Sequence, residues 1–420
     1  MPVSRGPFLK FAVRSLTYVA IVAVTLAAVD GICIALGLFP PTHDYGDPDL
    51  GWRPTPATGR MELNQCTEFS TGEVFRYQRN EDGIRTSLPR ARIEEDSGTI
   101  RIGVTGDSQT DLCAPNGLIH SGILESALRE AGLPAVVLTY GSGRYSPLQA
   151  YLAFRQVVGP YRPRALVLNL YTGNDFYDIL RPDDRPHFVQ VDSGYAVASP
   201  VWYALDDPKE KSVSRVLFAF RSVADRTGMR PLYLRVKALR QLGAEQGEGM
   251  SAVLAYMRNL WRARDPAVGY PEALTAQMLN QQLFFHHFPR SEEESLRRVE
   301  ALMKMIRVEN PDLLLVMSPI PSYELTGEQP VDSALLRTLS RLPLSLDSGR
   351  QQEGELYERL RRLSAEQNWL FVDNLAALRA ARGPDRLYND FDYHLLPPGS
   401  AVIGRAQSGV LLQHFSRLMR

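Results

Sequence analysis

Residues Thr99 to Ser108 read TIRIGVTGDS, and the fold class of this chain can be inferred from them. Apolar side chains alternate at Ile100, Ile102 and Val104, which is typical of a β-strand, and the following glycine predicts a turn. The next segment, GLIHSGILESALREAGL, has the apolar spacing of a helix. A strand that leads through a turn into a helix predicts an α/β fold.

Four more apolar stretches repeat the strand pattern along the chain. They are AVVLTYG from Ala135, ALVLNLY from Ala165 to Tyr171, DLLLVMSPI from Asp312 and WLFVDNL from Trp369. The continuous apolar run of ALVLNLY indicates a strand that is buried on both faces. Strands that alternate with helices predict a mostly parallel sheet covered on both sides, and such sheets bind ligands at the carboxyl ends of their strands.

The amino-terminal stretch Ser15–Leu38 has the character of a membrane anchor. Its 24 residues carry one charge, Asp30, and a helix of this length spans a hydrocarbon core of roughly 30 Å. Basic residues precede the stretch and the acidic HDYGDPDLG follows it, which predicts that the bulk of the chain lies on the periplasmic side. A cleaved signal peptide is the alternative, although its apolar region normally has only about 7–15 residues. We therefore expect residues 1–38 to form a cytoplasmic tip and a single-pass transmembrane helix.

The rest of the chain divides into a linker and one globular domain. Prolines punctuate a polar stretch after the anchor, so we expect residues 39–74 to form a linker and residues 75–420 to form the domain. The part of the domain from about residue 185 to about residue 290 lacks a strand repeat and predicts a helical insertion. Its segment RSVADRTGMRPLYLRVKALRQLG can lie on an anionic membrane surface, or it can be a cap helix with a solvated basic face.

Charge and cysteine content narrow the possible functions. Lysine plus arginine equals aspartate plus glutamate, at 47 each, which argues against nucleic-acid binding by the whole chain. Cys66 and Cys113 fall in the part expected outside the cytoplasm, where they either pair as a disulfide or remain two thiols. No C-x-x-C pair is present, and the adjacent His286 and His287 would point apart on a helix, so we expect no metal site.

Polar motifs follow three of the predicted strands directly. Gly106-Asp107-Ser108 puts a serine near a helix amino terminus, where backbone N–H groups favour developing negative charge. The glycines of residues 141–145, GSGRY, let the backbone approach a substrate, so that an N–H there could donate to an oxyanion. Asn174, in the third motif TGND, carries a neutral amide donor. Each motif taken alone can also be an ordinary turn or helix cap.

A fourth motif, DFDYHL, runs from Asp390 to Leu395 near the carboxyl terminus. A serine is a weak nucleophile at its ordinary pKa and needs a base within hydrogen-bond reach. A histidine beside a carboxylate provides that base together with the group that orients it. We take His394 as the base and Asp392 as its carboxylate, with Asp390 as the alternative acid. A surface histidine with nearby acids is the other interpretation of this motif.

Together and in this order, the four motifs resemble those of the SGNH, or GDSL, hydrolase superfamily. The GDS of Ser108 matches the first block, GSGRYSP the second, the GND of Asn174 the third, and Asp392-x-His394 the last. RNEDGIR, residues 79–85, also resembles a stretch that precedes the nucleophile block in membrane-anchored members. The resemblance covers about residues 75–175 and 312–415 and leaves out the helical insertion.

The resemblance implies a flavodoxin-like, doubly wound sheet and acyl-ester chemistry that needs no cofactor. Ser108 would attack an acyl carbonyl, His394 would take its proton, and Asp392 would orient His394. The oxyanion would be held by hydrogen-bond donors at the strand ends: the Ser108 N–H, the N–H of Gly143 or Arg144, and the Asn174 side chain. If the donor is Arg144, its side chain is expected to crowd or charge the pocket.

The implied activity is that of an ester hydrolase that acts on O-acetyl groups of an envelope or exported polysaccharide. An O-acyltransferase to a glycan would use the same triad, and an esterase that acts on lipid is a further alternative. The competing class is a catalytically silent member that binds glycan or scaffolds an export complex. The expected partners are thus an acylated glycan and, through the anchor, a membrane.

Overall fold

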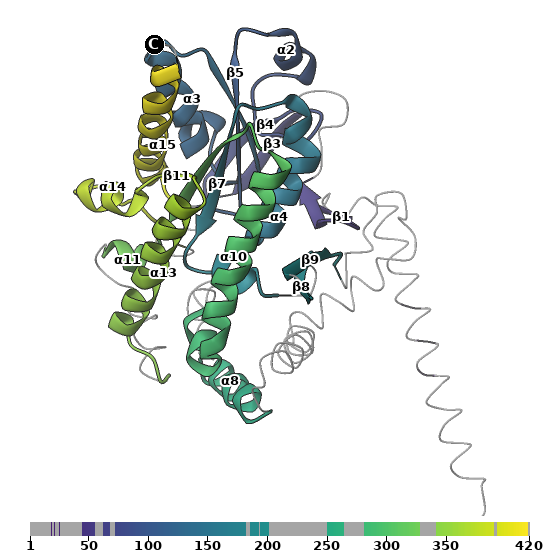
Figure 1. Cartoon of the computed structure of the whole chain (residues 1–420), viewed down its shortest axis with the longest axis vertical. Coiled ribbons are helices and arrows are strands. Elements are labelled where there is room, and N and C mark those ends of the chain that lie inside the picture. Colours follow the sequence, from purple (N-terminus) through teal and green to yellow (C-terminus); the bar gives the residue numbers. More distant parts are fainter. Residues whose placement is uncertain are drawn as a thin grey trace, which may run out of the picture.

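The structure is a computed structural model that describes residues 44–54, 62–67, 72–181, 185–192, 194–200, 250–263, 281–327, 342–389 and 393–418, with Tyr18, Ile21 and Thr25 further upstream. Its centre is a five-stranded parallel sheet (Figure 1). In chain order the strands are β5 (Ile100–Gly106), β6 (Ala135–Gly141), β7 (Ala165–Tyr171), β10 (Leu314–Ile320) and β11 (Leu370–Phe371). They lie side by side in the order β11-β10-β7-β5-β6, which is the flavodoxin-like order. The predicted α/β fold with a parallel sheet is therefore confirmed, and so are its five strands.

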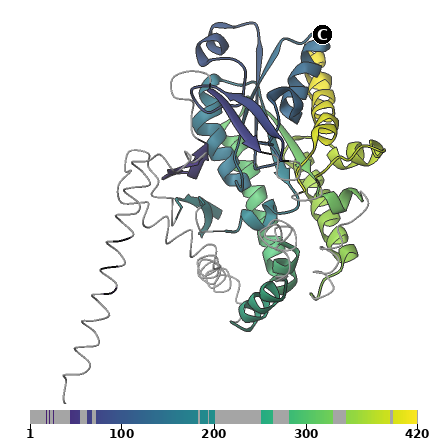
Figure 2. The same ribbon diagram turned by 180° about the vertical axis from the view of Figure 1, so that it is seen from behind.

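Helices cover both faces of this sheet. Their bounds are α2 (Arg90–Glu95), α3 (His120–Glu130), α4 (Pro147–Ala153), α5 (Asp175–Asp178), α8 (Met250–Ala263), α10 (Pro289–Glu309), α11 (Tyr323–Thr326), α13 (Leu346–Glu366), α14 (Asn374–Ala380) and α15 (Pro397–Leu418). On β7, Leu166, Leu168 and Leu170 join a core with α4, α10 and α13, whereas Ala165 and Val167 join a second core with α3 and α15. Figure 2 shows α15 in yellow beside α3 in blue. This burial on both faces accounts for the continuous apolar run of ALVLNLY.

The stretch expected to be a linker, residues 39–74, contains one antiparallel hairpin and the first strand of a second, so that expectation is corrected. The first joins β1 (Asp44–Asp47) to β2 (Gly51–Pro54), and the second joins β3 (Glu62–Thr67) to β4 (Val74–Arg79). Leu50 and Trp52 are buried in the larger core, which ties the first hairpin to the domain. A disulfide between Cys66 and Cys113 joins β3 to the loop after β5, which decides between the two alternatives for these cysteines.

The expected helical insertion contains strands as well as helices. A third hairpin joins β8 (His187–Val191) to β9 (Gly194–Ala198), and its Tyr195 hydroxyl hydrogen-bonds Glu294 of α10 at 3.0 Å. The prediction of a helical segment without strands is therefore corrected here, while α8 and the helical turn at 281–287 agree with it. Residues 201–249, which include the basic amphipathic segment, lie outside the described residues.

The predicted anchor, Ser15–Leu38, also lies outside the described residues, apart from Tyr18, Ile21 and Thr25. Over the part of the chain that the structure describes, no helix has both the length and the apolar character needed to cross a membrane.

Candidate active site

The predicted nucleophile lies in a tight turn at the carboxyl end of β5. The N–H groups of Thr110 and Asp111 donate to the Asp107 carbonyl oxygen at 3.1 and 3.2 Å, which closes the turn. Gly106 is required just before it, because a Cβ there would lie 3.0 Å from the Cβ of Asn169. Ser108 is half-buried, and among the described residues its hydroxyl has no hydrogen-bond partner. The hydroxyl is therefore free to meet a substrate or a base.

Gln109 connects this turn to the segment that carries His394. Its side chain is buried, Nε2 donates to the Tyr393 carbonyl oxygen at 3.1 Å, and Oε1 accepts from the Leu395 N–H at 3.1 Å. His394 thus sits between the two backbone groups that Gln109 holds. The residue next to the nucleophile therefore fixes the backbone on both sides of the predicted base, although 286 positions separate Gln109 from Leu395. Nothing in the local sequence pattern predicts this contact.

The His394 segment is also fixed from its other side. The Asn389 N–H donates to the His394 carbonyl oxygen at 2.8 Å, and Tyr393 adopts the left-handed conformation with φ 57°. The Tyr393 ring stacks on Tyr323 at 5.3 Å between centroids, directly after β10. His394 itself is half-buried, so its side chain remains partly accessible to solvent beside the edge of the sheet.

Asp107 is a carboxylate within electrostatic reach of His394. Burial raises the pKa of Asp107 to about 6, and the positive charge of His394 opposes that rise. Asp390 and Asp392 lie outside the described residues, so the choice between them as the orienting acid stays a prediction. The sequence did not single out Asp107 beyond its place in the GDS motif.

The loop after β6 presents the second predicted motif. Gly143 is open, since a Cβ added there would meet nothing within 4 Å. Arg144 adopts the left-handed conformation, φ 67°, and its guanidinium lies over the ring of Trp52 at 5.1 Å from the centroid. The Arg144 side chain is therefore engaged by the β1–β2 hairpin. Which of the two N–H groups would serve the oxyanion stays a prediction.

Asn174 follows β7 at the same edge of the sheet. It precedes α5 but makes no side-chain cap, which argues against the alternative that it is only a helix cap. Its Nδ2 donates to Asp178 Oδ2 at 2.8 Å. An amide nitrogen carries two hydrogens, so one remains to donate to an oxyanion.

Asp178 and Arg185 link the second motif to the third. Arg185, whose side chain is 1% exposed, pairs with Asp178 at 3.1 Å, and its Nε donates to the Arg144 carbonyl oxygen at 3.0 Å. The chain of contacts runs from Asn174 through Asp178 and Arg185 to the loop after β6. Both predicted sources of oxyanion donors are thereby held by one buried ion pair. Arg185 falls in the region assigned to the insertion, so the sequence did not suggest this role.

Asp175 is a further buried acid, close enough to Asp107 and Asp178 to feel their charges. Burial raises the pKa of Asp175 well above its usual range, and the charges of Asp107 and Asp178 add to that rise. Asp175 Oδ2 accepts from the Tyr171 N–H at 2.8 Å. A neutral carboxyl at Asp175 would relieve the repulsion among three buried acids.

Two arginines of the RNEDGIR stretch, residues 79–85, form ion pairs with the loop that follows the nucleophile turn. Arg79 pairs with Asp111 at 2.5 Å, and Arg85 pairs with the same carboxylate at 3.2 Å. Arg85 also donates to the carbonyl oxygens of Leu112 and Ala114, next to the disulfide at Cys113. Both arginines are buried, so this stretch anchors the loop that follows Ser108.

The predicted site residues that the structure describes thus gather at the carboxyl edge of the sheet. Ser108 follows β5, Gly143 and Arg144 follow β6, Asn174 follows β7, and Gln109 ties the His394 segment to the first of these. Among the described residues, no group of three or more His, Cys, Asp or Glu could hold a metal ion. The arrangement brings the predicted nucleophile, the segment of the predicted base and the predicted oxyanion donors to one edge of the sheet.

Comparison with known proteins finds similarity in structure alone. No protein-family model matches the chain, and no curated protein matches it. Solved structures similar to it include a lipase/acylhydrolase from Enterococcus faecalis, at 11% identity and a TM-score of 0.36 over 75% of this chain and 97% of that chain. A catalytic mutant of an acetylxylan esterase from Geobacillus stearothermophilus matches at 13% identity and a TM-score of 0.37, over 75% of this chain and 94% of that chain. The acetyl xylan esterase AlAXEase matches at 11% identity and a TM-score of 0.34, over 74% and 100%. Similarity at this level assigns the chain to no family.

Proposed function

We propose that this protein is a serine ester hydrolase of the SGNH type, with Ser108 as nucleophile and His394 as base. The observation that carries the proposal is the pair of hydrogen bonds from Gln109, which hold the backbone around His394 beside the turn of Ser108. The open Gly143 and the amide of Asn174 follow the two neighbouring strands.

The proposed reaction has two halves. Ser108 Oγ attacks the acyl carbonyl carbon while His394 takes the hydroxyl proton, and the oxyanion accepts hydrogen bonds from the strand-end donors. The carbon–oxygen bond to the alcohol then breaks, and His394 returns the proton to the departing alcohol. Water attacks the acyl-serine with His394 as base again, which releases the carboxylic acid and restores Ser108. Asp392 is the proposed orienting acid, with Asp390 as the alternative.

The proposed substrate is an O-acylated, most simply O-acetylated, envelope or exported polysaccharide. The proposed location is the periplasmic side, behind the predicted anchor Ser15–Leu38. The disulfide between Cys66 and Cys113 supports that location, because disulfides persist in oxidising compartments. Transfer of the acyl group to a glycan would use the same acyl-serine, with a sugar hydroxyl in place of water.

The test is labelling of the full-length chain with a fluorophosphonate probe. Wild type should label, and Ser108→Ala and His394→Ala should each lose the label. Ser97→Ala and His414→Ala are the matched controls, because Ser97 is exposed before β5 and His414 lies on α15, and both should label like wild type. A folded wild-type protein that does not label, or a Ser108→Ala variant that still does, would contradict the proposal. Hydrolysis of nitrophenyl acetate with and without an oligosaccharide acceptor then separates hydrolase from transferase.

A further inference from the structure

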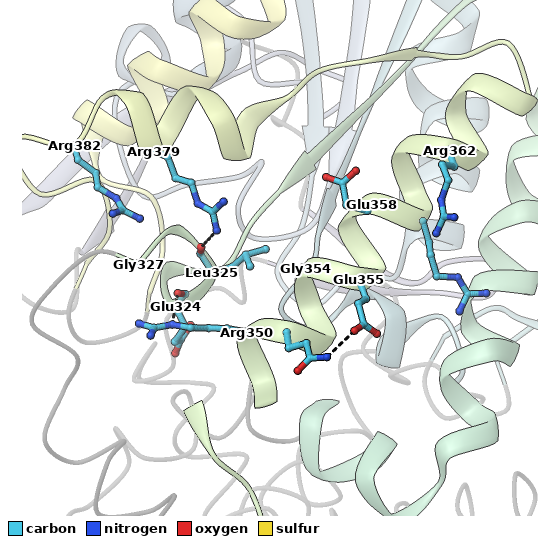
Figure 3. Close-up of a pocket in the computed structure, with 12 residues that line it drawn as sticks. Glu324, Leu325, Gly327, Arg350, Gly354, Glu355, Glu358, Arg362, Arg379 and Arg382 are labelled. Atoms are coloured by element: carbon cyan, nitrogen blue, oxygen red, sulfur yellow. Dashed lines mark hydrogen bonds between the residues drawn. The ribbon is translucent and has the colours of Figure 1, made fainter. Parts of the chain in front are cut away.

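A groove of about 910 Å³ lies among α11, α13 and α14, apart from the residues described above (Figure 3). Charged side chains dominate its lining. Among the described residues, Leu325 is the one apolar side chain in that lining. Five arginines contribute to it: Arg350, Arg359, Arg362, Arg379 and Arg382. Three glutamates accompany them: Glu324, Glu355 and Glu358. Figure 3 shows Arg379 and Arg382 on one side of the groove and Arg362 on the other.

The groove lies at the same edge of the sheet as the nucleophile. Helix α11 begins three residues after β10 ends, and β10 pairs with β7 along its whole length. Tyr171, the last residue of β7, shares a hydrophobic cluster with Tyr323 of α11 and with Leu112 of the loop after β5. Burial raises the pKa of Tyr171, and the charges of Glu324 on the groove side and Asp107 on the nucleophile side both add to the rise. Helix α11 thus follows β10, which lies two strands along the sheet from β5, the strand that Ser108 follows.

The lining carries five arginines against three glutamates, and one of these arginines, Arg359, pairs at 2.6 Å with Glu293 outside the lining. Arg362 and Arg382 are exposed and have no hydrogen bond or ion pair in the described part of the chain. Arg379 donates to the Leu325 carbonyl oxygen at 2.9 Å. Arg350 donates to the Glu324 carbonyl oxygen at 2.9 Å and also lies 3.8 Å from the carboxylate of the exposed Asp347. Gly327 leaves room for Arg382, since a Cβ there would lie 2.6 Å from its guanidinium.

Glu324 adds an observation that points to a ligand. Its side chain is 3% exposed, and its Oε2 has no hydrogen-bond partner among the described residues. Burial raises the pKa of Glu324 to about 8, and the charge of Glu353 adds to that rise. Near neutral pH the carboxyl is therefore mostly protonated, so it can donate a hydrogen bond and does not repel an anion.

We propose that this groove binds a carboxylate-bearing oligosaccharide, as the anionic part of the polysaccharide on which Ser108 acts. The assignment to a substrate rests on the proposed function, whereas the binding itself does not. Planar guanidinium groups match carboxylates in bidentate geometry, and Arg359/Arg362 and Arg379/Arg382 each repeat at a spacing of three residues. Successive cations along the groove suit successive acidic sugars.

The lining distinguishes this ligand from two others. A single-stranded nucleic acid would need aromatic side chains on which to stack its bases, and the lining contains none among the described residues. A lipid acyl chain would need an apolar channel, and Leu325 alone does not provide one. A sugar with carboxylates needs charge and hydrogen bonds, which this groove supplies.

The test is calorimetric binding of hexagalacturonate to full-length Ser108→Ala protein, in which turnover is excluded. We expect binding that weakens as salt is added, and at least tenfold weaker binding of neutral maltohexaose. Arg362→Glu with Arg382→Glu should weaken hexagalacturonate binding at least tenfold. The control Arg92→Glu, which reverses an exposed arginine on α2 before β5, should leave binding unchanged.

Each of the following results would contradict either the groove proposal or the proposed hydrolase. Equal binding of maltohexaose, or an unchanged affinity in the folded double variant, would overturn the proposal, as would an absence of hexagalacturonate binding. Binding of a hexathymidylate as tight as that of hexagalacturonate would overturn the assignment to a glycan. Binding of hexagalacturonate without fluorophosphonate labelling of wild type would refute the proposed hydrolase and leave the groove assignment intact.

Discussion

Gln109 accepts a hydrogen bond from the N–H of Leu395 at 3.1 Å, across 286 positions of the chain. The same side chain donates to the carbonyl oxygen on the other side of His394. The nucleophile turn and the predicted base are therefore placed relative to each other by one buried amide. His120 supports the arrangement, because its Nε2 lies 3.2 Å from the Gln109 carbonyl oxygen. Burial lowers the pKa of His120 to about 4, so it acts there as a neutral ring.

Gln109→Ala is expected to lower kcat for a small ester about 10- to 30-fold with little change in KM. Two buried hydrogen bonds at about 1 kcal/mol each amount to that factor if both are needed to position His394. Steady-state kinetics with nitrophenyl acetate provide the measurement, and Gln413→Ala on the exposed face of α15 is the control. Gln109→Glu keeps the side-chain oxygen that accepts from the Leu395 N–H, so its kcat should fall between that of wild type and that of Gln109→Ala. An unchanged kcat, or a rise in KM alone, would refute a positioning role for Gln109.

Arg185→Met is expected to destabilise the protein by about 3 kcal/mol and to reduce kcat. The substitution leaves Asp178 buried without its closest cation and frees the Arg144 carbonyl oxygen. Arg181→Met is a matched control, because Arg181 pairs with the same carboxylate at 3.4 Å from a side chain that is 27% exposed. That variant should lose less than about 1 kcal/mol. Urea unfolding measures the stability of both variants. Equal losses of stability would show that the buried ion pair contributes no more than the partly exposed one.

Glu324→Gln should stabilise the protein increasingly as the pH rises. The pKa of Glu324 is about 8 in the folded state against an ordinary value of 4.5, so the folded protein holds a proton that the unfolded chain releases between these values. The contribution of this group is fully present below pH 4.5 and is lost as the pH rises through 8. Gln imitates the protonated form, and its advantage in Tm should therefore grow from pH 5 to pH 9. With the exposed Glu366→Gln as control, a Tm difference independent of pH would argue against the raised pKa.

Removal of the disulfide should cost about 2–4 kcal/mol of stability. Cys66 and Cys113 are 47 positions apart, and closure of a loop of that size is worth about 4 kcal/mol in the unfolded chain. The double variant Cys66→Ser, Cys113→Ser should therefore unfold at lower urea concentration. Dithiothreitol should bring wild type to the same midpoint and leave the double variant where it is. A reductant effect of equal size in both proteins would exclude the disulfide as its cause.

Much of the sheet could be predicted from the sequence, because its strands form apolar runs, unbroken in β6 and β7 and alternating in β5. The motifs GDS, GSGRY and TGND could be placed at the carboxyl edge for the same reason, since each directly follows such a run. The hairpin β8–β9 carried a weaker signal, the short stretches HFVQV and GYAVA around a turn. It was missed because the rest of that region is helical in pattern.

The supports of the site could not be predicted, because they depend on contacts between distant residues. Trp52 lies among prolines and glycines without periodicity, yet its carbonyl oxygen accepts from the Tyr145 hydroxyl at 2.7 Å, 93 positions away. Gln149 reaches the Leu50 carbonyl oxygen across 99 positions, also at 2.7 Å. Such contacts leave no local pattern, and for that reason the prolines and polar residues around the first hairpin predict only a linker.

The buried pair of Asp178 and Arg185 also has a consequence for how this protein can change over generations. Loss of either charge alone removes the buried ion pair and leaves the remaining buried charge less well compensated, so a lineage cannot easily pass through a single substitution at one of these positions. Related sequences should therefore either retain both residues or replace both together. Arg181, which is nearer to solvent, should vary freely beside them. In an alignment of such sequences, the residues at positions 178 and 185 should change together.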